Sequence, residues 1–76
     1  MFTIYGAPWC GYCTKAKDLL DQKNLPYVYY DINEDEESQE FVMGLGVKTL
    51  PQIFDDLSER HHIGGYDDLV KYLEVI

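Results

Sequence analysis

The hydrophobic pattern changes its period at one place near the N-terminus, and this change limits the possible folds more than any other feature. Residues 1–5 alternate with the period of two that is typical of a β-strand. From Gly11 onwards the pattern is helical, and one face carries Cys13, Ala16, Leu19 and Leu20. A strand that leads directly into a helix is the first half of a β-α-β unit, so the next strand should pair with it in parallel through a right-handed crossover.

Three further strands are predicted from short runs of β-branched, aromatic and aliphatic residues. They are expected at residues 27–32, 51–54 and 60–63. The last two strands are joined by the short polar segment 55–59, which favours an antiparallel hairpin.

Two further helices are predicted from their capping signals. Asn33 followed by Glu36 resembles a capped start, and this helix should direct Phe41, Val42 and Leu45 inward before Gly44 and Gly46 end it. The last helix should be capped by Asp67 or Asp68. The resulting order, β-α-β-α-β-β-α, predicts an α/β fold with a four-stranded mixed sheet and three helices, and 76 residues predict a single domain over residues 1–76.

Composition excludes several classes of function. Six basic residues against fourteen acidic ones, a net charge of −8, argue against binding a nucleic acid backbone. The acidity favours solubility, or a partner with a basic docking face. No run approaches the roughly 20 apolar residues that span a bilayer. The first residues lack the features of a signal peptide, so a cytoplasmic location is expected.

The two cysteines, Cys10 and Cys13, are too close in sequence to form an effective structural crosslink. Their spacing favours redox or metal chemistry. A structural zinc usually takes four ligands. The only further candidates, His61 and His62, are adjacent on a predicted strand and should point to opposite faces, so no metal site is predicted.

The positions of the two cysteines predict different roles. Cys10 begins the first helix, where backbone N–H groups and the helix dipole favour a thiolate, and Lys15 and Lys17 add positive charge nearby. Cys13 lies one turn later on the apolar face and should be a buried thiol that attacks a mixed disulfide at Cys10. Gly11 keeps the intervening loop small, and Tyr12 should shield one side of it.

Together these motifs resemble the glutaredoxin family of the thioredoxin fold. The element order matches, and so do three segments: Cys10-Gly11-Tyr12-Cys13 followed by Ala16-Lys17, then Thr49-Leu50-Pro51-Gln52-Ile53-Phe54, then Ile63-Gly64-Gly65-Tyr66-Asp67-Asp68-Leu69. The resemblance covers nearly the whole chain and implies the thioredoxin fold.

The resemblance also implies a glutathione site. Pro51 would be the family's cis-proline, and the backbone of Leu50 would pair with an extended substrate. A glycine turn at a helix start would present N–H groups to a carboxylate, while Asp67 would accept from an ammonium group. The implied binding residues are Tyr12, Leu50, Pro51, Gly64, Gly65, Tyr66 and Asp67, with Trp9, Gly11, Thr49 and Lys15 in support.

The sequence departs from the family pattern at several places. Gly11 stands where many glutaredoxins have proline, and some members with glycine there bridge an iron–sulfur cluster between two subunits. No basic residue precedes Cys10, so Lys15 or Lys48 would have to hold a glutathione carboxylate, helped by Gln39 or Gln52. Trp9 is similar to the tryptophan of thioredoxins.

The predicted function is therefore glutathione-dependent reduction of protein disulfides and glutathione mixed disulfides, with Cys10 and Cys13 as the catalytic residues. Glutathione would be the reductant and no cofactor would be bound. The resemblance implies a monomer and, as a protein target, ribonucleotide reductase. Two alternatives stay open: a thioredoxin-like carrier reduced by a flavoprotein reductase, and a dimer that binds an iron–sulfur cluster with glutathione.

Overall fold

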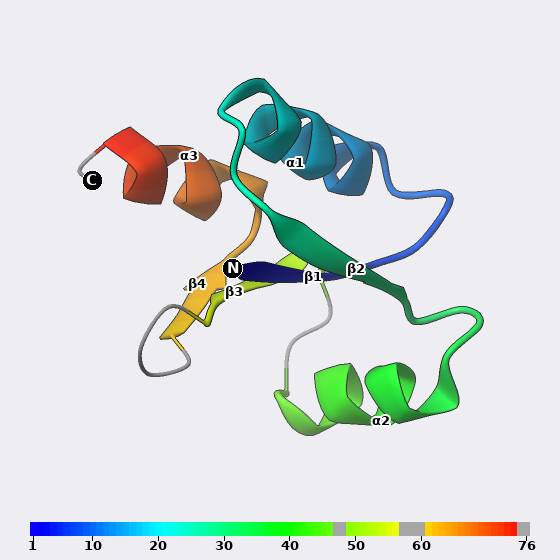
Figure 1. Cartoon of the computed structure of the whole chain (residues 1–76). Helices are drawn as coiled ribbons and strands as arrows, with labels where there is room; N and C mark the ends of the chain where they lie inside the picture. Colours follow the sequence, from blue (N-terminus) through cyan, green and yellow to red (C-terminus); the bar gives the residue numbers. More distant parts are fainter. Residues whose placement is uncertain (47–48, 57–60, 75–76) are drawn as a thin grey trace.

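The computed structural model describes residues 1–46, 49–56 and 61–74 (Figure 1). Its elements follow the predicted order: β1 (Phe2–Gly6), α1 (Gly11–Gln22), β2 (Tyr27–Asp31), α2 (Glu36–Gly44), β3 (Gln52–Asp55), β4 (His61–Gly64) and α3 (Tyr66–Glu74). The strands form one sheet in the order β2-β1-β3-β4. The β1–β2 pair is parallel and the β1–β3 and β3–β4 pairs are antiparallel, so the predicted mixed sheet and α/β class are confirmed.

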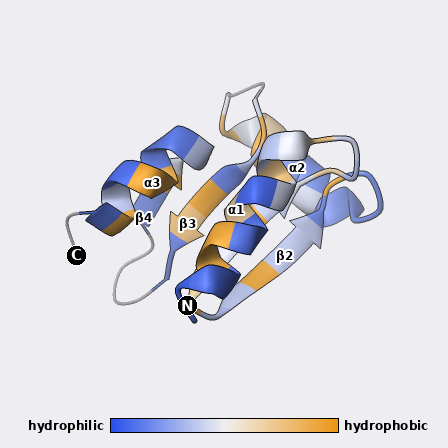
Figure 2. Ribbon diagram, turned by 90° about the horizontal axis from the view of Figure 1, so that it is seen from above, coloured by the Kyte–Doolittle hydropathy of each residue, from blue (hydrophilic) through white to orange (hydrophobic). Residues whose placement is uncertain are grey.

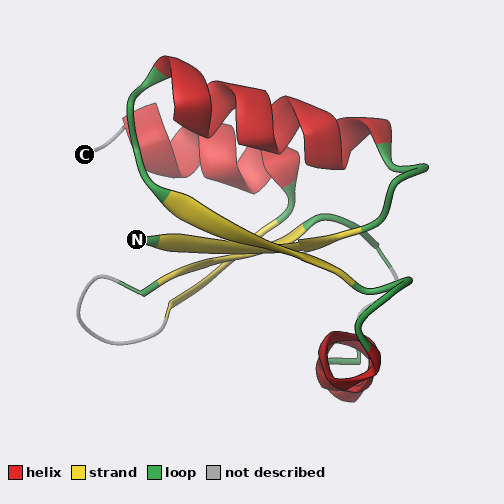
Figure 3. Cartoon of the chain, turned by 45° about the vertical axis from the view of Figure 1, so that its right-hand side comes forward, coloured by secondary structure: helices red, strands yellow, loops and turns green. Residues whose placement is uncertain are grey.

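Helices cover both faces of the sheet. Helices α1 and α3 lie side by side on one face, and α2 lies alone on the other (Figure 3). Alternate residues of each strand therefore face two separate apolar layers. The larger layer contains Phe2, Ile4, Ala16, Leu20, Ile53, Leu69 and Leu73, and the smaller contains Tyr5, Val42 and Phe54. Figure 2 shows the amphipathic pattern of α1, with hydrophilic and hydrophobic residues alternating along it, and the hydrophobic middle of β3.

The start of α2 differs from the prediction. The N-cap is Asp35, not Asn33. The Asp31 side chain accepts a hydrogen bond from the Asn33 N–H at 2.8 Å, and the Asp31 carbonyl accepts from the N–H groups of Glu34 and Asp35. Because these bonds form a turn, the helix begins after it, and Glu36 and Glu37 occupy its first turn.

The start of α3 also differs. The helix begins at Tyr66, so Asp67 and Asp68 lie in its first turn and neither is the N-cap. The Asp68 carboxylate reaches back and accepts from the Gly65 N–H at 3.1 Å, which is one half of a capping box. Gly64 has φ +120°, a conformation that favours glycine.

The smaller differences concern strand ends and one side chain. Strand β1 extends one residue further than predicted, through Gly6, and β4 is shifted to His61–Gly64. Residues 57–60 of the predicted connection and fourth strand lie outside the described residues. Phe41 is 37% exposed, although its ring packs against those of Tyr5 and Phe54. None of the described helices is long and apolar enough to span a membrane.

Candidate active site

Cys10 occupies the N-cap position of α1. Its backbone is extended, with φ −93° and ψ 106°, and its Sγ accepts a hydrogen bond from the Cys13 N–H at 3.2 Å. The sulfur thus takes the place that an oxygen of serine or aspartate takes in an ordinary cap. The first turn of α1 carries no acidic residue, and a helix N-terminus stabilises negative charge. The predicted placement of Cys10 at the helix start is confirmed.

Cys13 lies one turn inside the helix and is only 1% exposed. Burial raises the pKa of its thiol to about 12, assisted by a hydrogen bond with Cys10 and by the charge of Cys10. A backbone hydrogen bond with Ala7 and the charge of Lys17 lower the pKa by less. Cys13 is therefore a protonated thiol at neutral pH.

Gly6 makes the space in which the Cys13 sulfur lies. A Cβ atom at Gly6 would lie 2.7 Å from Cys13 Sγ and 3.0 Å from the Tyr29 hydroxyl oxygen, both too close for an unshifted structure. Burial, followed by the charge of Cys13, raises the pKa of Tyr29 to about 12. The Nζ of Lys17 lies 4.2 Å from the centroid of the Tyr29 ring.

Gly6 and Tyr29 are site residues that the sequence pattern does not identify. The pattern indicates only the end of a strand at Gly6 and only a strand residue at Tyr29. In the parallel register Tyr29 lies opposite Ile4, two residues before Gly6 and on the same face of the sheet, so its side chain can reach the space beside Gly6. The available signal is a glycine at the carboxyl end of the strand that leads to the cysteines.

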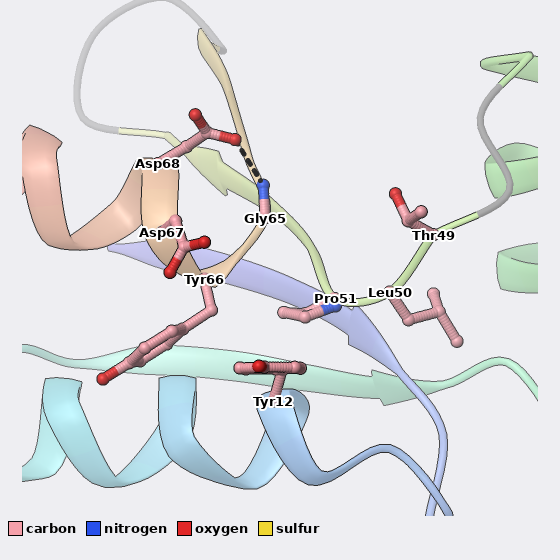
Figure 4. A pocket seen from close by; sticks show the side chains of 8 residues that line it. All are labelled: Tyr12, Thr49, Leu50, Pro51, Gly65, Tyr66, Asp67 and Asp68. Atoms are coloured by element: carbon pink, nitrogen blue, oxygen red, sulfur yellow. Dashed lines mark hydrogen bonds between the residues drawn. The ribbon is translucent and has the colours of Figure 1, made fainter.

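Most of the predicted binding residues line one cleft of about 250 Å³. Its lining comes from α1, from the loop before β3 and from the start of α3, and comprises Tyr12, Thr49, Leu50, Pro51, Gly65, Tyr66, Asp67 and Asp68. Figure 4 shows the Tyr12 ring facing Pro51, with Tyr66 beside it. The rings of Tyr12 and Tyr66 are 5.9 Å apart. The Leu50–Pro51 peptide bond is cis, as the family resemblance implied.

The start of α3 forms one wall of this cleft. The Gly65 N–H is already bonded to Asp68, so it differs from the unbonded donor expected there. The next amides, at Tyr66 and Asp67, belong to the first turn and have no acceptor within the helix. Asp68 is a lining residue that the sequence predicts only as a possible cap, and its spacing of three from Gly65 is the signal for its role.

The remaining predicted residues lie around the cleft or away from it. Gly64 precedes the lining residues and sets the turn. Lys15 lies beside the cleft, with Nζ 4.9 Å from the centroid of the Tyr12 ring. Trp9 is 70% exposed and is absent from the described lining of the cleft. Gly11 is exposed and has open space where a Cβ would stand. Lys48 lies outside the described residues.

The two histidines point to opposite faces of the sheet, as predicted. The ring of His61 stacks on Tyr72 of α3 at 5.8 Å, and the ring of His62 stacks on Phe54 at 4.6 Å. They therefore do not converge on a common point with the cysteine pair.

Comparisons with known proteins agree with this geometry. The family model described as Glutaredoxin matches residues 2–58. Glutaredoxin 1 of Rickettsia prowazekii (strain Madrid E) is 45% identical over 69 residues, which cover 87% of this chain and 70% of that protein. Glutaredoxin 1 of Escherichia coli (strain K12) is 35% identical over 79 aligned positions, covering 93% of this chain and 89% of that protein.

Among solved structures, a crystal structure of a buckwheat glutaredoxin–glutathione complex superposes with a TM-score of 0.78. The two chains are 23% identical, and the superposition covers 97% of this chain and 68% of the buckwheat chain. This structural similarity supports the thioredoxin-type fold. With the family match and the two bacterial relatives, the conclusion is plain: the chain belongs to the glutaredoxin family of thiol–disulfide oxidoreductases.

Proposed function

We propose that this chain is a dithiol glutaredoxin that uses glutathione to reduce protein disulfides and glutathione mixed disulfides. The observation that carries the proposal is the cleft formed by Tyr12, the Leu50–Pro51 loop and the start of α3. It brings together an aromatic wall, exposed backbone and a helix N-terminus that carries a carboxylate. These groups can bind a small peptide that has a free carboxylate and a free ammonium group at one end.

Each part of the cleft suits one part of glutathione. The first-turn amides at Tyr66 and Asp67 would bind the γ-glutamyl carboxylate, and the Asp67 carboxylate would accept from its ammonium group. The backbone of Leu50 would pair with the cysteinyl residue. Lys15, whose Nζ lies 4.9 Å from the centroid of the Tyr12 ring, would meet the glycyl carboxylate. The glutathione bound in the buckwheat neighbour of the same fold is consistent with this assignment.

The first chemical step falls to Cys10. Its thiolate, at the N-cap of α1, attacks one sulfur of the target disulfide. A new S–S bond forms at Cys10, the target's S–S bond breaks, and the second target sulfur leaves as a thiolate. Because Cys10 is half-buried while Cys13 is fully buried, an incoming disulfide meets Cys10 first.

Cys13 carries out the second step, which begins only after the first step has formed the mixed disulfide at Cys10. Part of what keeps Cys13 protonated is the hydrogen bond with Cys10 and the charge on Cys10. When Cys10 enters a mixed disulfide, that charge disappears and its sulfur becomes a weaker acceptor, so the pKa of Cys13 falls. Cys13 then loses its proton, attacks the Cys10 sulfur and releases the reduced target, leaving a Cys10–Cys13 disulfide.

Glutathione restores the dithiol in two exchanges. One glutathione thiolate attacks Cys10, which forms a mixed disulfide and frees Cys13. A second glutathione attacks the sulfur of the bound glutathione and leaves as glutathione disulfide, with Cys10 as the departing thiolate. The two electrons of the reduction thus come from two glutathione molecules.

A comparison of reductants tests the proposal. The Cys10–Cys13 disulfide is offered either glutathione with glutathione reductase or a thioredoxin reductase, each with NADPH. We expect turnover with glutathione. Fast reduction by the flavoprotein reductase and none by glutathione would instead support the thioredoxin-like alternative. The exposed Trp9, which is similar to the tryptophan of thioredoxins, is the feature that favours this alternative. A coloured, iron-containing dimer without exchange activity would support the cluster-binding alternative.

We further propose a cytoplasmic setting and, from the family resemblance, ribonucleotide reductase as a protein target. Two cysteines at this spacing are typical of redox chemistry in a reducing compartment. Deoxyribonucleotide formation by a purified ribonucleotide reductase, with this chain and glutathione as the only reductants, would test the second assignment. Absence of product would remove it without affecting the glutathione assay.

A further inference from the structure

We propose that Gln52 and His62 are positioning residues, which orient the Leu50 backbone on one side of the cleft through a chain of hydrogen bonds to Thr49. This inference rests on the proposed glutathione function. Neither side chain lines the cleft itself.

Gln52 holds the Thr49 backbone. Its side chain is buried, with 3% exposed, and its Nε2 donates to the Thr49 carbonyl at 2.7 Å and to Thr49 Oγ1 at 3.3 Å. With the amide nitrogen directed at Thr49, the opposite atom, Oε1, is an acceptor. Gln52, which the sequence suggests as a possible ligand of glutathione, is therefore engaged within the protein.

His62 completes the chain. Its Nε2 lies 2.7 Å from Gln52 Oε1. Because Oε1 can only accept, Nε2 must carry the proton, and the direction of donation is from His62 to Gln52 to Thr49. The His62 ring lies at 16° to the ring of Phe54, so stacking fixes its orientation.

The chain ends on the peptide group that matters for binding. The Thr49 carbonyl and the Leu50 N–H belong to one planar peptide unit. A hydrogen bond that fixes the carbonyl therefore also fixes the direction of the Leu50 N–H, the donor proposed to pair with the substrate backbone. His62 precedes the Gly64–Gly65 turn in β4, so the same chain links the Thr49–Leu50 side of the cleft to the strand that leads into α3.

A matched pair of substitutions tests the role of His62. His62→Phe keeps an aromatic ring to stack on Phe54 but removes the donor. His61→Phe is the control, because His61 stacks on Tyr72 on the other face of the sheet and is outside the chain of hydrogen bonds. The substrate is a mixed disulfide between glutathione and a short peptide.

For His62→Phe we expect KM to rise about three- to tenfold, the range that corresponds to one lost hydrogen bond, with kcat within about twofold of the wild type. His61→Phe should keep both parameters of the wild type. The rate at which iodoacetamide alkylates Cys10 should be the same in all three proteins. Equal KM values for the two variants, or a fall in kcat with no change in KM, would overturn the proposal.

Two further readouts keep the inference separate from the proposed function. The amide resonance of Leu50 should shift in His62→Phe and not in His61→Phe, whether or not glutathione is the substrate. If the wild type does not turn over with glutathione but Leu50 shifts as expected, the proposed function fails and the positioning role stands. Gln52→Met, which removes all three hydrogen bonds of the Gln52 side chain, should raise KM at least as much as His62→Phe, and a wild-type KM in that folded variant would contradict the role.

Discussion

Two cysteines only three positions apart lie in opposite surroundings. Cys10 lies at the half-buried tip of α1, where it caps the helix and accepts from a backbone N–H. Cys13 is enclosed beneath that tip, against Gly6 at the end of β1 and near Tyr29 of β2. The tip is accessible, whereas burial at the enclosed position raises the pKa of the Cys13 thiol and keeps reagents out. One helical turn is thus enough to separate an attacking thiol from a resolving thiol.

The glycines of the two regions show the same contrast. A Cβ added at Gly11, at the tip, would have nothing within 4 Å, while a Cβ at Gly6, in the enclosed region, would lie 2.7 Å from the Cys13 sulfur. Close packing therefore constrains the region around the resolving thiol, Cys13, and leaves open space around the attacking thiol, Cys10. Substitutions in each region test how far that difference extends.

The largest effect is expected from Cys10→Ser. Since Cys10 is the group that meets the substrate, this substitution should reduce both protein disulfide reduction and glutathione mixed disulfide turnover to background. The measurement is NADPH consumption coupled to glutathione reductase. Appreciable turnover in this variant would mean that Cys13 attacks substrates by itself.

Cys13→Ser should affect the two reactions differently. Reduction of protein disulfides should fall to background because no resolving thiol remains, whereas turnover of glutathione mixed disulfides should continue, since that reaction needs one thiol. The same coupled assay with the two substrates measures the division. Equal losses in Cys10→Ser and Cys13→Ser would remove the distinction between the two positions.

Gly6→Ala should destabilise the fold by about 1–3 kcal/mol, the usual cost of overpacking a close contact. The displaced Cys13 sulfur should also become easier to alkylate. Urea unfolding of the reduced protein measures the first effect and timed alkylation the second. Unchanged stability together with unchanged protection of Cys13 would show that the enclosed region is loosely packed.

The enclosed region should also make stability depend on alkaline pH. The pKa of Cys13 rises from 9.0 to about 12 and that of Tyr29 from 10.0 to about 12, so the folded state holds these protons more tightly than the unfolded state. The resulting stabilisation is complete below about pH 9 and is lost as the pH rises towards about 12. Urea unfolding of the reduced protein across this interval should show the decline, and a smaller decline is expected for Cys13→Ser. Identical profiles for the two proteins would exclude Cys13 as a contributor.

Gly11→Ala is the smallest expected change and the matched control for Gly6→Ala. With open space and a helical position, alanine should stabilise the protein by about 0.4–1 kcal/mol. Activity should remain close to that of the wild type. A loss of stability as large as that of Gly6→Ala would mean that the tip is as tightly constrained as the region beneath it.

Local patterns predicted the fold well because each element carries its own periodicity. The strand and helix order and the asymmetry of Cys10 and Cys13 follow from neighbours in sequence. Helix starts were less predictable. Asp31 forms a turn before α2 by accepting from the Asn33 N–H, and Asp68 accepts from the Gly65 N–H from within the first turn of α3. Such competition between nearby carboxylates depends on turn geometry that the pattern of residues does not contain.

Contacts between distant segments were beyond the sequence pattern. Gly6 and Tyr29 meet Cys13 through the parallel register of β1 and β2. The hydrogen bonds from His62 to Gln52 and from Gln52 to Thr49 depend on the β3–β4 pairing and the loop before β3. The family resemblance supplied the cleft residues in advance except Asp68, but not the side chains that hold them.

Site-resolved alkylation tests the division of labour between the two thiols most directly. The reduced wild-type protein is treated at neutral pH with less than one equivalent of iodoacetamide, and fragment mass spectra locate the label; the urea-unfolded protein, in which both thiols are exposed, is the control. We expect the label on Cys10 in the folded protein and on both cysteines in the unfolded one. A label that favours Cys13 in the folded protein, or is shared equally, would contradict the assignment of Cys10 as the attacking thiol.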